Sequence, residues 1–158
     1  MYLLWLLPIS AALHITEEFV FPGGFTAWYR NYKQSVSSSF TARYLININL
    51  ILIILCILPL FLDEIQAVAL WLSMASVVFF NAFFHIGAYI RTKKYVPGIV
   101  TSILIYIPMA LYGYWYFLSS GKVSIEQAIT SGSIGIIYLF FSAYNHKRRA
   151  KKLSSSTD

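Results

Sequence analysis

The sequence predicts an all-α integral membrane protein, a bundle of about five transmembrane helices, from three observations. Of its 158 residues, 58% are hydrophobic and only 11% are charged, whereas a soluble domain carries about 25% charged residues. The apolar residues gather in five stretches, and a spanning helix needs about 20 mostly apolar residues. These stretches do not alternate polar and apolar residues, as strands of a membrane β-barrel would. We therefore expect one transmembrane domain over residues 1–146 and a basic, disordered cytoplasmic tail over residues 147–158.

The five expected spans have boundaries that can be read from the sequence. The first covers residues 2–21 and ends at Pro22 to Gly24, which cannot continue a helix. It lacks the basic residues that precede the apolar part of a signal peptide, so no cleavage is expected. The other spans cover residues 44–62, 66–90, 97–118 and 126–144. Pro97 suits the first turn of its helix, and the single cysteine, Cys56, excludes an intrachain disulfide.

Basic residues predict the orientation of the bundle. Eleven of the twelve lysines and arginines lie in the first loop, the third loop and the tail, which five spans place on one side. By the positive-inside rule this side is the cytoplasm, so the N-terminus is outside and the C-terminus is cytoplasmic. The net charge of +6 then indicates contact with anionic lipid. No nucleic-acid partner is expected, because these residues flank helices instead of forming one basic face. The eleven are Arg30, Lys33, Arg43, Arg91, Lys93, Lys94, Lys147, Arg148, Arg149, Lys151 and Lys152.

The few polar residues inside the spans lie near the expected cytoplasmic ends. His14, Glu17 and Glu18 belong to the last two turns of the first span, and their spacings of three and four residues place them on one face. Asn81 and His85, four residues apart, share a face near the end of the third span. Because the orientation was derived from other residues, the common depth of these groups predicts a polar site within the membrane.

The second and fifth spans bring further polar groups to the same end. Asn47 and Asn49 lie two residues apart in the second span, so at most one of them faces the cluster. Such amides most often form hydrogen bonds between membrane helices. His146 precedes the run of basic residues in the tail, and we expect it to be solvated.

Two adjacent carboxylates inside a membrane must be neutralised, because each charge costs about 2.5–3.5 kcal/mol on insertion scales. No lysine or arginine lies within an expected span. Three answers stay open: one glutamate is protonated, a histidine is cationic, or a divalent cation is bound. Two carboxylates, two neutral imidazoles and one divalent cation sum to zero charge, and mixed nitrogen and carboxylate ligation suits zinc or non-haem iron. The candidate catalytic and metal-binding residues are His14, Glu17, Glu18 and His85, supported by Asn81 and Asn47.

A structural alternative applies to the same residues. Glu17 and Glu18 would then be solvated at the interface, and His85 would only form a hydrogen bond to Asn81 or to a backbone carbonyl.

Other features of the sequence are structural. Small residues permit close packing of the fifth span, and an aromatic stretch with a serine-rich link suits the cytoplasmic surface as a connector or a lid. These residues are Ser131, Gly132, Ser133 and Gly135, and Phe25, Trp28, Tyr29, Tyr32 and residues 35–39.

The segment from His14 to Glu18, followed by Pro22 to Phe25 and Trp28, resembles the HXXEE family of small bacterial membrane proteins, which is named for this motif. Asn81 and His85, followed by residues 95–98, are similar to the second block of that family. The resemblance covers residues 10–30 and 78–110 and implies a bacterial inner-membrane location. Because the family has no assigned function, it supports His14, Glu17 and Glu18 as a functional set and implies no substrate.

Three functions are compatible with this site. The favoured one is an intramembrane enzyme, a hydrolase above others, with a cytoplasm-facing His/Glu site that works with zinc or iron or as a metal-free acid–base set. Its partners would be membrane lipids and a lipid-like or membrane-associated peptide substrate. The others are a proton- or ion-coupled transporter, which would need a homo-oligomer, and a non-catalytic binding or immunity protein. Intramembrane proteases with paired glutamates offer an analogy only, because they carry an arginine where this chain has Pro22.

Overall fold

The computed structural model describes residues 2–20, 24–39 and 41–154, and all regular secondary structure within these ranges is helical. Long helices form from the apolar stretches, and short 3₁₀ and π segments extend two of them. The elements are α1 (Tyr2–Val20), α2 (Gly24–Tyr32), η1 (Gln34–Ser39), α3 (Ala42–Ile57), η2 (Leu58–Phe61), α4 (Glu64–Thr92), α5 (Ile99–Thr101), η3 (Ser102–Tyr106), α6 (Ile107–Ser119) and α7 (Ile125–Ser154).

Four helical segments of the described chain are long and apolar enough to cross a membrane. They are α1, α3 with η2, α4, and the continuous helix formed by α5, η3 and α6. The expected all-α architecture is therefore confirmed. α7 stands where the fifth span was expected but is not among the four, because small polar residues and glycines over 130–135 interrupt its apolar sequence.

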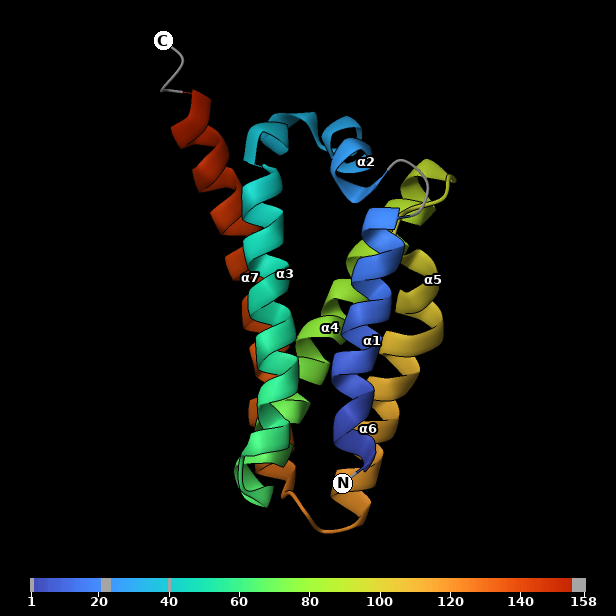
Figure 1. Ribbon diagram of the computed structural model, residues 1–158, viewed down its shortest axis with the longest axis vertical. Coiled ribbons are helices and arrows are strands. Elements are labelled where there is room, and N and C mark those ends of the chain that lie inside the picture. The colour runs from blue at the N-terminus through green and yellow to red at the C-terminus, as the bar shows by residue number, and fades with distance from the viewer. Residues whose placement is uncertain (1, 21–23, 40, 155–158) are drawn as a thin grey trace.

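The long helices alternate in direction, so the connections fall at two ends of the bundle (Figure 1). α2, η1, the connection between α4 and α5, and the C-terminal end of α7 lie at the upper end of Figure 1. The N-terminus and the connections before α4 and α7 lie at the lower end. Segments carrying eleven of the twelve basic residues therefore share one end, as the charge pattern predicts. We refer to this as the basic end.

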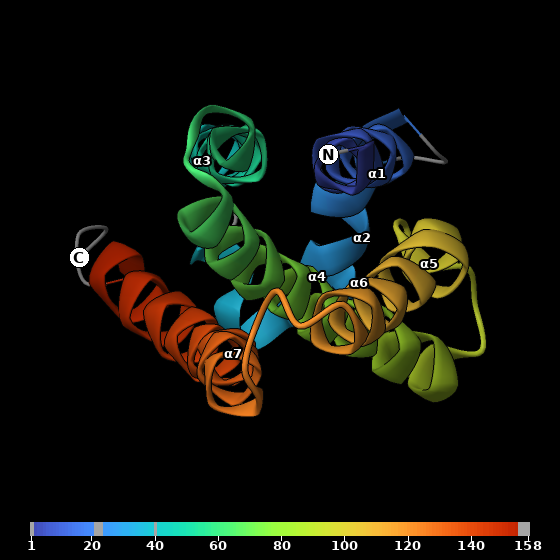
Figure 2. The same ribbon diagram turned by 90° about the horizontal axis from the view of Figure 1, so that it is seen from below.

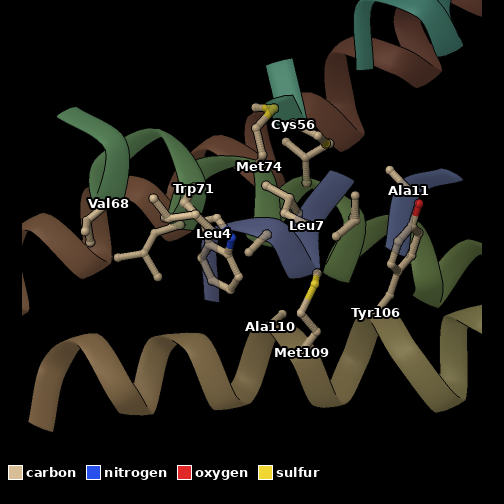
Figure 3. Packing of buried hydrophobic residues seen from close by; sticks show 14 of the residues in the cluster. Leu4, Leu7, Ala11, Cys56, Val68, Trp71, Met74, Tyr106, Met109 and Ala110 are labelled. Atoms are coloured by element: carbon tan, nitrogen blue, oxygen red, sulfur yellow. The ribbon is translucent and has the colours of Figure 1, made fainter. Parts of the chain in front are cut away.

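α4 lies at the centre, with α1 and α3 on one side and α6 and α7 on the other (Figure 2). Leu7, Trp71 and Met109 are buried where α1 and α6 pack on α4, in a core that Figure 3 shows from close by. A Cβ atom at Gly113 would lie 2.1 Å from the Trp71 ring, so only glycine lets this ring pack against α6. Close contact of this kind is what holds membrane helices together, because lipid is as apolar as their side chains.

α7 packs chiefly along α4, and small residues allow the two backbones to approach. A Cβ atom at Gly135 would lie 2.5 Å from the Ser76 carbonyl oxygen, whereas one at Gly132 would meet only the Tyr114 hydroxyl at 3.5 Å. The Gly135 N–H donates to Ser76 Oγ at 3.0 Å. The predicted close packing of this helix is therefore present at Gly135 and looser at Gly132.

The fourth spanning helix begins two residues later than expected. Pro97 and Gly98 form a turn, and the helix starts at Ile99 because Gly98, with φ of +89°, is not helical. The helix then widens into a π turn over Ser102–Tyr106. Pro108 explains this, since it has no N–H to donate to the Leu104 carbonyl and its ring would clash there in a regular helix.

Basic-end segments are more ordered than expected. α7 continues to Ser154, so residues 147–154, expected to be disordered, are helical. Residues 35–39, expected as a flexible link, belong to η1. Contacts in and beside the two segments explain both differences. The Arg149 guanidinium carbon lies 4.1 Å from the Tyr44 ring centroid. His146 was expected to be solvated, but its Nδ1 lies 2.9 Å from Ser39 Oγ. Residues 155–158 and the expected helix end at Pro22 and Gly23 lie outside the described residues.

Candidate metal centre

Three of the predicted site residues converge between α1 and α4. Glu18 Oε1 lies 3.4 Å from His14 Nε2 and 3.4 Å from His85 Nε2. All three side chains offer ligand atoms within 4.8 Å of one another. His14 and His85 are 2% and 0% exposed, and Glu18 is 8% exposed. The helical spacing that places His14 and Glu18 on one face of α1 directs both toward His85 on α4.

Glu18 has no strong cationic partner. Among the described residues, no lysine or arginine forms an ion pair with either Glu17 or Glu18. His14 Nε2 is buried and makes no hydrogen bond with a described residue, although Glu18 Oε1 lies 3.4 Å away. The centre therefore holds a buried carboxylate and an unpaired imidazole nitrogen, which are costly unless another group satisfies them.

Asn81, predicted as a supporting residue, contacts His85. Its side-chain nitrogen lies 3.2 Å from His85 Nε2, four residues along the same helix. Asn47, by contrast, is exposed and does not reach the cluster. Asn49, two residues further, lines the adjoining cavity and donates to the Leu45 carbonyl at 3.0 Å. Only one of the two amides faces inward, as their spacing predicts.

Glu17 points to a different set of partners. Its Oε1 accepts hydrogen bonds from the Tyr95 hydroxyl at 2.8 Å and the Val100 N–H at 3.0 Å. Its Oε2 accepts from the Thr101 N–H at 2.8 Å and the Thr101 hydroxyl at 2.5 Å. Free N–H groups at a helix start favour an anion, so Glu17 caps the fourth spanning helix from outside it. Both carboxylate oxygens of Glu17 accept hydrogen bonds, and the structure does not bring Glu17 into the cluster of His14, Glu18 and His85.

Thr101 links Glu17 to His14. Its hydroxyl has one hydrogen, which the short contact assigns to Glu17, and its oxygen lies 2.7 Å from His14 Nδ1. The oxygen therefore accepts a hydrogen bond from the Nδ1–H, which leaves the lone pair of a neutral His14 on Nε2. This is the nitrogen that faces Glu18.

Gly98 explains how the two histidines can lie so close to a helix start. A Cβ atom there would lie 2.7 Å from His14 Cε1 and 2.8 Å from His85 Cε1. Its positive φ also starts the helix at the position from which Val100 and Thr101 reach Glu17. The Pro97-Gly98 turn thus shapes both the histidine pair and the glutamate cap.

A cavity of about 450 Å³ opens beside the centre, and His14, Glu18 and Asn81 form part of its wall. α2 and η1 cross its upper end, with Tyr29 and Val36 facing into it. Phe25 and Tyr29 of the predicted aromatic stretch therefore lie in the wall of this cavity, whereas Trp28 and Tyr32 do not. Most of the remaining wall is apolar and comes from α3 and α4: Leu45, Ile48, Ile51, Leu52, Leu55, Met74, Val77, Val78 and Phe84.

Sequence reasoning missed Tyr95, Thr101 and Tyr106. Tyr106 lines the cavity, its ring centroid lies 4.4 Å from that of His14, and its buried hydroxyl makes no hydrogen bond within the described chain. Figure 3 shows that hydroxyl pointing toward α1. Burial and the hydrogen bond to Glu17 raise the pKa of Tyr95, so its hydroxyl stays protonated as a donor. The signal available was the Pro97-Gly98 turn, which predicts free N–H donors at the depth of the glutamates.

Comparison with known proteins places this site in a family. A family model described as "Protein of unknown function with HXXEE motif" matches residues 5–113, which is more than half of the chain. The match includes the whole centre and Glu17 with its partners, and it ends before α7. No curated protein matches the chain. No solved structure matches it.

Proposed function

The chain belongs to the HXXEE-motif family, whose function is unknown, and we propose that it is a metal-dependent intramembrane hydrolase acting on a lipid-like substrate. The observation that carries this proposal is the convergence of His14, Glu18 and His85 beside a largely apolar cavity. A buried His/Glu group that adjoins a ligand-sized cavity is the default candidate for an active site.

The spacing of the centre favours zinc or iron. Tetrahedral zinc with nitrogen and oxygen ligands at about 2.1 Å separates neighbouring ligand atoms by about 3.4 Å. Glu18 Oε1 lies at this distance from both histidine Nε2 atoms. Three protein ligands leave a further coordination position for water, the usual arrangement in catalytic sites. Thr101 would orient His14 through Nδ1, as residues behind metal ligands commonly do.

The same residues support hydrolysis of an ester or amide. A bound metal would polarise the carbonyl and lower the pKa of water. Water adds its oxygen to the carbonyl carbon and passes a proton to the Glu18 carboxylate. The bond to the leaving oxygen or nitrogen then breaks as that atom takes the proton. Tyr106 would donate its unpaired hydroxyl to the carbonyl oxygen as negative charge develops.

We place the basic end in the cytoplasm, with α7 as a fifth span and the N-terminus outside. Glu126 is the only aspartate, glutamate, lysine or arginine between residues 125 and 146. The exposed residues of α7 include the apolar Ile136, Ile137 and Phe140. At about 1.5 Å per residue, such a helix is long enough to cross a bilayer. The cavity then opens near the cytoplasmic surface of the inner membrane.

One contact favours a metal-free version of the same chemistry. The Asn81 side-chain nitrogen lies within hydrogen-bond distance of His85 Nε2, at 3.2 Å. His85 would have to break this hydrogen bond before Nε2 could bind a metal. Without metal, Glu18 would be the general base and a histidine the general acid. This version keeps the substrate and the cavity and differs only in metal content.

The first test is metal content, by elemental mass spectrometry on detergent-purified protein after loading with zinc or with iron. We expect near-stoichiometric metal in the wild type. His14→Ala, Glu18→Gln and His85→Ala should each lower metal affinity more than about 100-fold, because loss of a merely orienting residue already costs about 10–100-fold.

Tyr106→Phe is the matched control, since it alters a buried neighbour of His14 without removing a ligand. It should retain metal and lose activity on lipid esters. Well-folded wild type that binds neither metal would overturn the metal-dependent proposal, and folding is checked by circular dichroism on every sample.

A further inference from the structure

We propose that the cavity binds a lipid with an anionic headgroup, which contacts Lys33 and Lys147 at the basic end while its chain fills the apolar part between α3 and α4. The inference rests on the proposed function, because it names the substrate class of the same site.

The cavity is long and mostly apolar. Its wall runs from Tyr44 to Leu55 on α3 and from Met74 to Phe84 on α4, which is roughly 15 Å at a rise of about 1.5 Å per residue. The lysines of the wall, Lys33 and Lys147, lie at the basic end, whereas Leu52, Leu55 and Met74 at the other end are apolar. An acyl chain suits this lower part, whereas a peptide backbone would leave its polar groups without partners there.

The opposite end of the cavity is positively charged. Lys33 and Lys147 belong to its wall, from the α2–η1 connection and from α7. Neither lysine forms an ion pair with a described acidic residue. Burial, with the positive charges of Arg91 and Lys147, lowers the pKa of Lys33. An anion placed between these cations would relieve their mutual repulsion, and a zwitterionic headgroup of zero net charge would do so less.

The metal centre lies between these two ends. On α4, Asn81 beside the centre comes after the apolar Met74, Val77 and Val78 and before Phe84 at the upper wall. Lys33 Nζ lies 5.5 Å from the Phe84 ring centroid. A lipid with its headgroup at the lysines and its chain among the apolar residues therefore presents the linkage between them to His14 and Glu18. That linkage, an ester in common lipids, is the bond the proposed chemistry would cleave.

Binding of two matched lipids tests the assignment. Palmitoyl lysophosphatidic acid and palmitoyl lysophosphatidylcholine carry the same chain, and they differ in headgroup and net charge. Native mass spectrometry of the purified protein in detergent measures the affinity for each lipid, and metal content is measured on the same samples. We expect the anionic lipid to bind at least about tenfold more tightly, as a charge-assisted contact would give.

Variants of wall residues test where the headgroup and the acyl chain of the lipid bind. Lys33→Gln and Lys147→Gln should each weaken the anionic lipid about tenfold and leave the zwitterionic one unchanged. Lys94→Gln, at the same end but outside the cavity wall, is the charge-matched control and should change neither. Leu52→Trp should weaken both lipids by filling the apolar part, whereas Ile54→Trp, on the exposed side of α3, should not.

Outcomes separate this inference from the proposed function. Equal affinity for the two lipids, or an equal effect of Lys94→Gln and Lys33→Gln, overturns the headgroup assignment even if the protein retains its metal. Selective binding by a protein that takes up no metal supports the headgroup assignment and overturns the metal-dependent hydrolase. Retained affinity for both lipids in a folded Leu52→Trp variant overturns the placement of the chain.

Discussion

Glu17 and Glu18 are neighbours in sequence with different surroundings. Adjacent helix residues point about 100° apart at 3.6 residues per turn, and this angle decides their partners. Glu18 faces two histidines, with its Oε1 atom 3.4 Å from the Nε2 atom of each. Glu17 accepts four hydrogen bonds that fix the fourth spanning helix against α1. The pair therefore divides into one carboxylate that lies beside the histidines and one that positions the groups around it.

Thr101 allows this positioning role to be measured. Thr101→Val keeps the side-chain shape but removes the hydroxyl between His14 Nδ1 and Glu17 Oε2. Two buried polar atoms lose a partner, so we expect a loss of about 1–3 kcal/mol in the free energy of unfolding. Zinc affinity should fall about 10–100-fold, because His14 is no longer held in one tautomer and orientation. Competition with a chromophoric chelator measures the second effect.

Thr16→Val is the matched control on α1. The exposed Thr16 hydroxyl donates only to the Ala12 carbonyl of its own helix at 2.8 Å. This substitution should leave zinc affinity unchanged. If Thr101→Val matches Thr16→Val in affinity, the hydrogen bond to His14 has no part in holding the metal.

At the scale of elements, the close contact between α4 and α7 depends on Gly135, which has no side chain. Gly135→Ala would place Cβ 2.5 Å from the Ser76 carbonyl, a backbone atom that cannot rotate away. Overpacking of this kind costs about 1–3 kcal/mol, which exceeds the gain of up to about 1 kcal/mol from replacing glycine by alanine in a helix. We therefore expect Gly135→Ala to lower the free energy of unfolding in mixed detergent micelles.

Gly132→Ala, one turn earlier on α7, supplies the comparison. Its Cβ would meet only the Tyr114 hydroxyl at 3.5 Å, an ordinary contact, so helix propensity should dominate and stability should stay equal or rise. Equal destabilisation by both substitutions would show that glycine flexibility, and not the approach of α4, is what α7 requires.

For the whole molecule, the sequence was sufficient to predict which residues lie at one depth but not which neighbour each one meets. Apolar length and charge placement predicted the helices and their alternating directions, because both follow from local sequence. The pairings of Glu17 with Thr101 and of Gly98 with the histidines depend on helix packing and on a turn at Pro97, which the sequence assigned to the helix itself. Residues 147–154 show the same limit, since their helix is held by contacts to residues far away in sequence.

Orientation across the membrane is a property of the whole molecule and can be tested at both ends of α7. With Cys56 replaced by alanine, Ser120→Cys introduces one exposed thiol just before α7, and Arg148→Cys introduces one near its C-terminal end. The positive-inside rule predicts that an impermeant maleimide added to intact spheroplasts labels Ser120→Cys at once, and Arg148→Cys only after permeabilisation. Ser38→Cys, in η1 at the basic end, should behave like Arg148→Cys. The reversed pattern would place the cavity mouth outside the cell. Equal labelling of Ser120→Cys and Arg148→Cys in intact spheroplasts would mean that α7 does not cross the membrane, which leaves four spans and puts both chain ends on one side.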